Sequence, residues 1–137
     1  MSGAIFLISG EPQRCARISR WILDWIDHSG ADLERSVYLL DSIELARASL
    51  SEPLREGDPP LLVIIDRATA GDPSFAALVS DCIPECWVIE ILGEQDLVPT
   101  RPTIVGIRQN ARRDEWESML HHCLHECPTP QWSRIEE

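Results

Sequence analysis

The chain has 137 residues, 44% of them hydrophobic, which suits one globular domain with its own core and leaves little room for a second. Its 12 basic and 23 acidic residues give a formal net charge of −11, which disfavours direct contact with nucleic acid. Five cysteines without a Cys-x-x-Cys pair indicate neither a disulfide framework nor a zinc ribbon. Because no signal peptide or membrane-spanning run is recognisable, we expect a cytoplasmic protein that does not contact membranes.

The first part of the chain predicts a strand, a helix and a second strand. An uninterrupted apolar run at residues 4–8 indicates a buried strand, and the Gly-Glu-Pro turn at residues 10–12 suits the start of a helix. Apolar residues then recur at helical spacing as far as Ile26, so the helix should end near residues 29–30. A second strand is expected at residues 37–40.

The central strand of the predicted sheet follows a short helix and a loop. Asp41, with a glutamate three residues later, has the spacing of a capping box and predicts a helix to about Leu50. Two prolines and a glycine at residues 52–59 indicate a loop. Residues 60–66 read as a parallel strand covered on both faces, and we expect its carboxyl end to present Asp66 to solvent.

A third helix is expected after a second loop. Residues 67–71 predict the loop, and Asp72 followed by proline resembles a helix cap. Residues 75–79 supply the apolar face of this helix, and Pro84 ends it.

The last part of the chain predicts two more strands and one helix. Residues 87–92 form the fourth strand, and Glu90 within it suggests that one face of this strand is less covered than the others. Residues 93–102 contain two prolines and suit a helix poorly. The fifth strand is expected at residues 103–107, and residues 116–127 show the best helical periodicity in the chain. The order predicts a three-layer, doubly wound α/β fold built on a parallel sheet.

Five short strands, an acid after the third and Gly-Glu-Pro after the first together resemble the receiver domain of two-component response regulators. The resemblance covers residues 4–127 and rests more on the order of elements than on motifs. It implies a flavodoxin-like (βα)5 sheet with strand order 2-1-3-4-5 and a helix 4 that is shortened or missing. The receiver-like domain would span residues 1–128, and residues 129–137 would be a tail or the start of a linker.

The site positions of that family are only partly kept. In receivers, strand 1 usually ends in an acidic pair, strand 3 in the phosphoacceptor aspartate, strand 4 in Thr or Ser, and strand 5 in Lys-Pro. Asp66 falls at the phosphoacceptor position. The other positions fall on Ser9 and Gly10 for the acidic pair, on Glu11 if the pair is shifted by one residue, on Leu92 for the hydroxyl, and on Arg108 or Gln109 for the lysine.

These replacements have a chemical meaning. Phosphoryl transfer to a carboxylate needs a hard divalent cation held by several oxygens, and Ser9 with Gly10 offers few. The side chain of Leu92 cannot donate a hydrogen bond to a phosphoryl group. We therefore expect a pseudo-receiver that signals without phosphorylation, catalysis or a cofactor, such as the regulatory domain of a transcriptional regulator. The alternative is a functional atypical receiver, phosphorylated on Asp66 with Mg²⁺ bound through Glu11.

A missing helix 4 would uncover an apolar face of strands 4 and 5, so we expect a protein partner or a homodimer. The interface candidates are Trp21 at the margin of the first helix, Glu90 in the fourth strand, and Trp132 in the tail.

A second alternative is a metal-binding or redox protein that uses the last helix. His121 and His125 stand at i and i+4, a spacing that can hold a transition metal. Cys123 and Cys127 lie on the opposite stripe of the helix, so a solvated histidine face is the favoured interpretation and no metal site is expected.

Overall fold

The computed structural model of the protein describes residues 4–29, 36–55 and 60–126. The strands are β1 (Ala4–Ile8), β2 (Ser36–Leu40), β3 (Leu62–Asp66), β4 (Trp87–Leu92) and β5 (Ile104–Arg108). The helices are α1 (Pro12–Ser29), α2 (Ile43–Arg55), α3 (Arg67–Ala70), α4 (Ser74–Cys82) and α5 (Arg113–His121), with a π-helical turn η1 (His122–Glu126) after α5. None of the described helices has both the length and the apolar character needed to cross a membrane.

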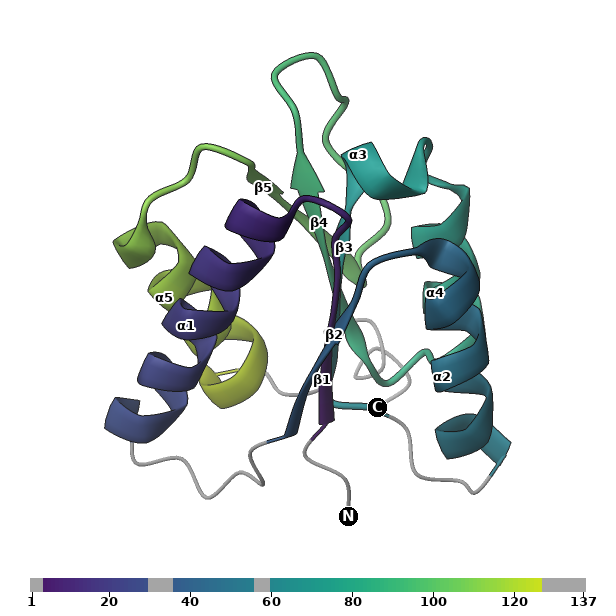
Figure 1. Cartoon of the computed structure of the whole chain (residues 1–137), viewed down its shortest axis with the longest axis horizontal. Coiled ribbons are helices and arrows are strands. Elements are labelled where there is room, and N and C mark those ends of the chain that lie inside the picture. The colour runs from purple at the N-terminus through teal and green to yellow at the C-terminus, as the bar shows by residue number, and fades with distance from the viewer. Residues whose placement is uncertain (1–3, 30–35, 56–59, 127–137) are drawn as a thin grey trace.

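The five strands form one parallel sheet in the order β2-β1-β3-β4-β5, as the resemblance implied. Helices α1 and α5 cover one face, and α2 and α4 cover the other (Figure 1). Every residue of β1, β3 and β4 is buried, because both faces of these strands are covered. The prediction of a three-layer, doubly wound α/β fold is confirmed.

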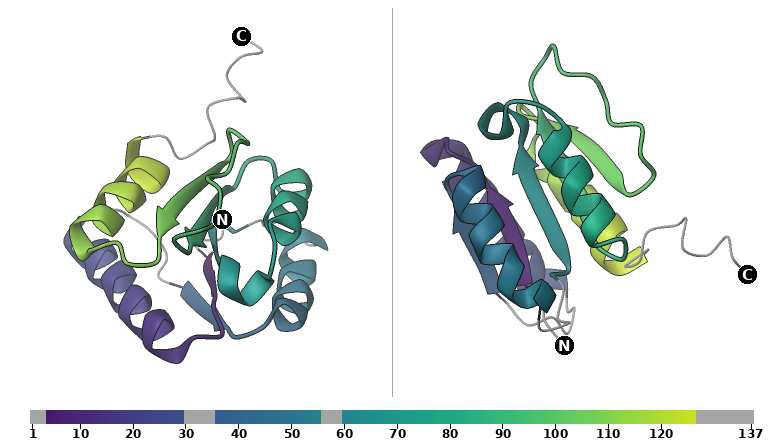
Figure 2. Two further views of the ribbon diagram at one scale, coloured as in Figure 1. Left: turned by 90° about the horizontal axis from the view of Figure 1, so that it is seen from above. Right: turned by 90° about the vertical axis from the view of Figure 1, so that its right-hand side faces the viewer.

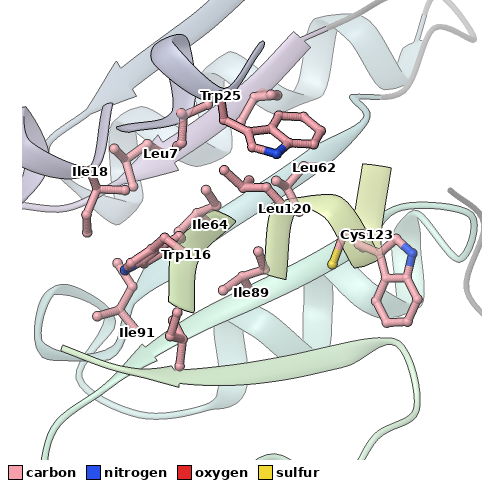
Figure 3. Packing of buried hydrophobic residues seen from close by; sticks show 14 of the residues in the cluster. Leu7, Ile18, Trp25, Leu62, Ile64, Ile89, Ile91, Trp116, Leu120 and Cys123 are labelled. Carbon is pink, nitrogen blue, oxygen red and sulfur yellow. The ribbon is translucent and has the colours of Figure 1, made fainter. Parts of the chain in front are cut away.

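Each face of the sheet has its own hydrophobic core. On the α1 and α5 side, Ile18 and Trp116 pack with Leu7 and Ile64, and all four side chains are almost completely buried (Figure 3). The opposite core joins the other face of the sheet to α2 and α4. Successive side chains along β1 and β3 point to opposite faces of the sheet, so these two apolar strands contribute to both cores.

Helix α2 differs from its prediction at both ends. The hydroxyl of Ser42 accepts the backbone N–H of Leu45 at 3.2 Å, so Ser42 caps the helix where Asp41 was expected to. The helix also continues to Arg55, past position 53, where a proline was expected to prevent it. A proline inside a helix removes one backbone hydrogen bond, and the remaining bonds carry α2 through it.

The expected loop at residues 67–71 is instead the short helix α3. Its cap is the residue that ends the preceding strand: Oδ1 of Asp66 accepts the N–H of Ala68 at 3.3 Å. Gly71 ends the helix at φ 87°, a conformation that favours glycine, and donates its N–H to the carbonyl of Arg67 at 2.8 Å. A helix of four residues is too short to give a periodic pattern in the sequence, so the sequence predicted a loop here.

No helix forms between β4 and β5, in agreement with the prediction of a shortened or missing helix 4. Figure 2 shows this segment as an irregular chain. It packs back on the sheet: a Cβ placed on Gly106 would lie 2.9 Å from Cδ of Pro99. Its tip is exposed, with Leu97 at 84% and Val98 at 62%.

The prediction that one face of β4 is less covered was wrong, because Glu90 is buried. Its side chain is 1% exposed and accepts two hydrogen bonds from Arg67, at 2.8 and 2.9 Å. A buried carboxylate requires such a partner, and the guanidinium of Arg67 supplies it from the next element.

Candidate functional site

Asp66 is fully buried at the carboxyl end of β3, which corrects the prediction that it faces solvent. Its Oδ2 accepts one hydrogen bond from Nη1 of Arg14 at 2.5 Å and another from the hydroxyl of Ser9 at 2.8 Å. Its Oδ1 accepts the N–H of Ala68 at 3.3 Å. Both carboxylate oxygens are therefore engaged by groups of the same chain, and a guanidinium neutralises the charge.

Helix α1 positions the arginine that makes this ion pair. The carboxylate of Glu11 accepts the backbone N–H of Arg14 at 2.5 Å and that of Gln13 at 3.3 Å, which caps the start of the helix. One turn into the helix, the guanidinium of Arg14 bridges the site, since its Nη2 donates to Oε1 of Gln109 at 2.9 Å. The turn after β5 is thus linked to Asp66 through Arg14.

The two remaining predicted positions lie apart from the carboxylate. Arg108 turns to the segment after β4, where its Nη1 donates to the carbonyls of Gly93 at 2.5 Å and Asp96 at 2.9 Å. Leu92 is 1% exposed and packs over β5, so that its Cδ1 would lie 2.7 Å from a Cβ on Gly106. Of the alternatives for the lysine position, Gln109 is the residue that joins the network.

Gly10 lies close to the backbone of a neighbouring loop. A Cβ on Gly10 would approach the carbonyl oxygen of Asp41 to 3.1 Å, and its N–H donates to the hydroxyl of Thr69 at 2.7 Å. The turn after β1 is thereby tied to α3. Thr69 was not predicted to belong to the site.

The site does not fit the Mg²⁺ that the receiver fold implies. A hard cation needs several free oxygen ligands, but Oδ2 of Asp66 is taken by Arg14 and Ser9, and the carboxylate of Glu11 caps α1. Ser9 and Gly10 provide no further carboxylate. The guanidinium of Arg14 occupies the electrostatic role that a cation would have beside Asp66.

Arg14 was not predicted to belong to the site. One signal could have found it. A buried acid at the end of a strand needs a compensating positive charge. Arg14 is the first basic residue after β1, and Arg67 is the first basic residue after β3. Arg67 pairs with Glu90, which leaves Arg14 for Asp66.

The predicted interface residues lie in different environments. Trp21 is partly buried at the edge of the α1 core, with the guanidinium of Arg17 at 5.7 Å from its ring centroid. Glu90 is buried and paired, and Trp132 lies outside the described residues.

The described residues bring together no group of three or more His, Cys, Asp or Glu side chains that could hold a metal. His121 and His122 are exposed, Cys123 is fully buried, and Cys127 lies outside the described residues. The last helix changes to π-helical hydrogen bonding at η1, so the i, i+4 relation between His121 and position 125 no longer follows α-helical spacing.

One thiol lies beside the acidic site. Burial raises the pKa of the Cys15 thiol above its ordinary value, and the carboxylates of Asp66 and Glu11 raise it further. A thiol so placed stays protonated at neutral pH and is a poor nucleophile.

Comparison with known proteins agrees with this fold. The sequence matches no protein-family model and no curated protein. A solved structure of a response regulator receiver domain protein from Bacillus halodurans is similar, with a TM-score of 0.61 and 13% identity, over 89% of this chain and 97% of that one. The protein has the fold of a receiver domain.

A second similar structure belongs to a larger enzyme. The lysine decarboxylase LdcF of Francisella novicida matches with a TM-score of 0.55 and 14% identity, over 92% of this chain but only 18% of the decarboxylase. The same fold therefore occurs in proteins of different activity, and the function has to be argued from the site.

Proposed function

We propose that this protein is a degenerate receiver-like signalling module that accepts no phosphoryl group at Asp66 and acts by binding a protein partner or a second copy of itself. The ion pair between Arg14 and Asp66 carries this proposal. Its Nη1 to Oδ2 distance is 2.5 Å, and the two side chains are 16% and 0% exposed. A carboxylate held in this way is not free to attack phosphorus.

The cost of freeing Asp66 supports the proposal. Removing one partner of a buried ion pair typically costs about 3–5 kcal/mol, because the remaining charge is left without compensation. Attack through Oδ2 would require this oxygen to leave both Arg14 and Ser9, and attack through Oδ1 would require it to leave the N–H of Ala68 at the start of α3. The incoming phosphoryl group would also add negative charge, and the acidic pair that binds a cation in receivers is replaced here by Ser9 and Gly10.

The alternative of a working atypical receiver has less support. It requires Glu11 as a cation ligand, but the Glu11 carboxylate accepts two backbone N–H groups at the start of α1. It also lacks a hydroxyl at Leu92, which is packed over β5.

Exposed apolar residues support a role in protein binding. Tyr38 and Leu39 are 49% and 51% exposed on β2, which is an edge strand of the sheet. Leu97 and Val98 are exposed on the segment that replaces helix 4. Edge strands and apolar loop tips are common sites of association between chains. The net charge of −11 argues against nucleic acid as the direct partner.

A phosphorylation assay tests the proposal. The full chain is incubated with Mg²⁺ and acetyl phosphate, and separately with Mg²⁺ and beryllofluoride. We expect no change in intact mass and no shift of the amide resonances of Asp66 and its neighbours. The matched variant Asp66→Asn, which keeps the size of the side chain but lacks the carboxylate, should give the same spectra with and without the reagents. Addition of one phosphoryl group to the native chain, but not to the variant, would contradict the proposal.

A further inference from the structure

Positive charge collects in one hollow of this acidic protein. The hollow has a volume of about 720 Å³ and lies between α1, the turn after β5 and the start of α5. Four arginines line it, Arg14, Arg17, Arg112 and Arg113, and Glu11 is its single acidic residue. One third of the 12 basic residues of the whole chain thus line a single concavity, although acids outnumber bases by 23 to 12.

Two of these guanidinium groups have no acidic partner within the described residues. Arg14 is held by Asp66 and Gln109, and Arg113 pairs at 3.2 Å with Asp24 and at 3.2 Å with Glu117. Arg17, in contrast, contacts the ring of Trp21. In the part of the chain that the structure describes, Arg112 takes part in no side-chain hydrogen bond or ion pair.

The guanidinium groups that face this hollow repel each other, and a bound anion would relieve that repulsion. Arg17 and Arg112 are exposed, so both can reach a ligand from solvent. Helices α1 and α5 both begin at the hollow, but the Glu11 carboxylate caps α1 and the first turn of α5 carries Asp114 and Glu115, so the arginine side chains supply the positive charge. The cap position of α5 is Arg112, whose side chain makes no capping hydrogen bond.

We infer that this hollow binds a small molecule that carries adjacent phosphate groups, a diphosphate or triphosphate. Arg17 and Arg112 are its direct contacts. The planar guanidinium group donates paired hydrogen bonds that fit the oxygens of a phosphate, and two such groups match two neighbouring phosphates. The amides of Gln13 and Asn110 in the same lining are further donors. The volume exceeds what one phosphate ion fills.

The hollow is connected to the receiver-like site through one residue. Arg14 lines the hollow and also donates to Asp66 and Gln109. Phosphates bound to Arg17 and Arg112 would also attract the neighbouring guanidinium of Arg14, which the carboxylate of Asp66 holds. This coupling rests on the proposed function, in which Asp66 is an acceptor of hydrogen bonds rather than of a phosphoryl group, whereas binding in the hollow does not depend on it.

Calorimetric titration tests the site. The full chain is titrated with inorganic phosphate, pyrophosphate, ATP and citrate, all without added metal. We expect pyrophosphate and ATP to bind with a stoichiometry of one, and phosphate and citrate to bind more weakly. Equal affinity for pyrophosphate and ATP would support recognition of the phosphates alone, and tighter ATP binding would support added contacts to the nucleoside. The inference would be overturned if neither pyrophosphate nor ATP bound saturably with a Kd below about 10 mM. It would also be overturned if citrate bound as tightly as pyrophosphate.

Matched variants separate specific contacts from overall charge. Arg17→Gln with Arg112→Gln should weaken pyrophosphate binding at least about tenfold, which corresponds to about 1.4 kcal/mol. Arg47→Gln is the control, because Arg47 also lies over an aromatic ring, that of Phe75 at 5.6 Å, but outside this hollow. It should change the affinity less than about twofold. Equal weakening by the control would show a general charge effect and overturn the site.

A further variant tests the coupling. Asp66→Asn removes the charge that competes for Arg14, so pyrophosphate should bind more tightly, by roughly threefold to tenfold. Asp41→Asn removes an equal charge near the same edge of the sheet and should have a smaller effect. Unchanged or weaker binding by Asp66→Asn would overturn the coupling while leaving the binding site in place. The phosphorylation assay above remains the separate test of the proposed function.

Discussion

The guanidinium of Arg67 holds the carboxylate of Glu90 by two parallel hydrogen bonds, from Nε at 2.8 Å and from Nη2 at 2.9 Å. The two side chains are 11% and 1% exposed. This pair allows an acid inside the otherwise apolar strand β4, and the hydrogen bond to Glu90 raises the pKa of Arg67. The partner of Glu90 in the register with β5 is Gly106.

Glu90→Ala should destabilise the protein by about 3–5 kcal/mol, because it leaves the largely buried guanidinium of Arg67 without its carboxylate. Urea unfolding followed by circular dichroism measures the change. The double variant Arg67→Met with Glu90→Leu removes both charges and fills a similar volume, so it should be much closer to the native stability. A double variant that is as unstable as Glu90→Ala would show that packing, rather than the unpaired charge, sets the cost.

Gly106→Ala should also destabilise the protein, by about 1–3 kcal/mol, since the added methyl group overpacks a closed contact. Its Cβ would lie 2.7 Å from Cδ1 of Leu92 and 2.9 Å from Cδ of Pro99. The Leu92 side chain can move, but the proline ring is fixed to the backbone of the segment that replaces helix 4. Combining Gly106→Ala with Pro99→Ala should recover part of the loss in thermal unfolding. Full stability of the single variant would mean that this segment does not pack on β5.

Arg14 offers a test of geometry at constant charge. Arg14→Gln leaves Asp66 buried without a cation and should cost about 3–5 kcal/mol in urea unfolding. Arg14→Lys keeps the charge, but an ammonium cannot donate to Asp66 and Gln109 in the planar geometry of a guanidinium, so it should lie between native and Arg14→Gln. Arg20→Gln, an exposed change on the same helix, should stay within about 0.5 kcal/mol of native. Equal stability of the Lys and Gln variants would indicate that charge contributes little.

The fold could be predicted because its signals are local. The apolar runs of β1 and β3 and the periodicity of α1 each depend on a few consecutive residues. The surroundings of Asp66 and Glu90 could not be predicted in the same way. Their partners are separated from them by 52 and 23 positions in sequence. A buried acid at a strand end indicates that a nearby basic residue is needed, but the spacing does not indicate which arginine reaches which acid.

Short capping structures were the other source of error. Helix α3 has four residues and depends on a cap from Asp66, so it leaves no periodic pattern. The prediction that Asp66 faces solvent was wrong because neither α3 nor the approach of α1 could be inferred from the residues around Asp66. The chain turns sharply after β3, and α1 brings Arg14 over the carboxylate.

The order of thiol modification should follow burial. In a Cys127→Ser background, Cys82 is exposed and should react first with a thiol reagent, and Cys15 should react more slowly because its pKa is raised. Cys86 and Cys123 are fully buried and should react only after unfolding. Mass spectrometry of peptides after timed labelling measures the order. Early labelling of Cys86 in the native protein would contradict the described packing.

Alkaline pH should weaken the fold through Cys86. Burial raises the pKa of this thiol to about 12, and the thiol donates to the carbonyl of Trp87 at 3.3 Å. The thiol holds its proton more tightly in the folded chain than in the unfolded chain, where its pKa is about 8.5. Its contribution to the free energy of unfolding is therefore fully present below about pH 8.5. That contribution is lost as the pH rises from there toward the folded value. The urea midpoint should therefore fall more steeply above about pH 8.5 in the native protein than in Cys86→Ala, which lacks the titrating group. Parallel decline of the two proteins would assign the alkaline loss to other groups.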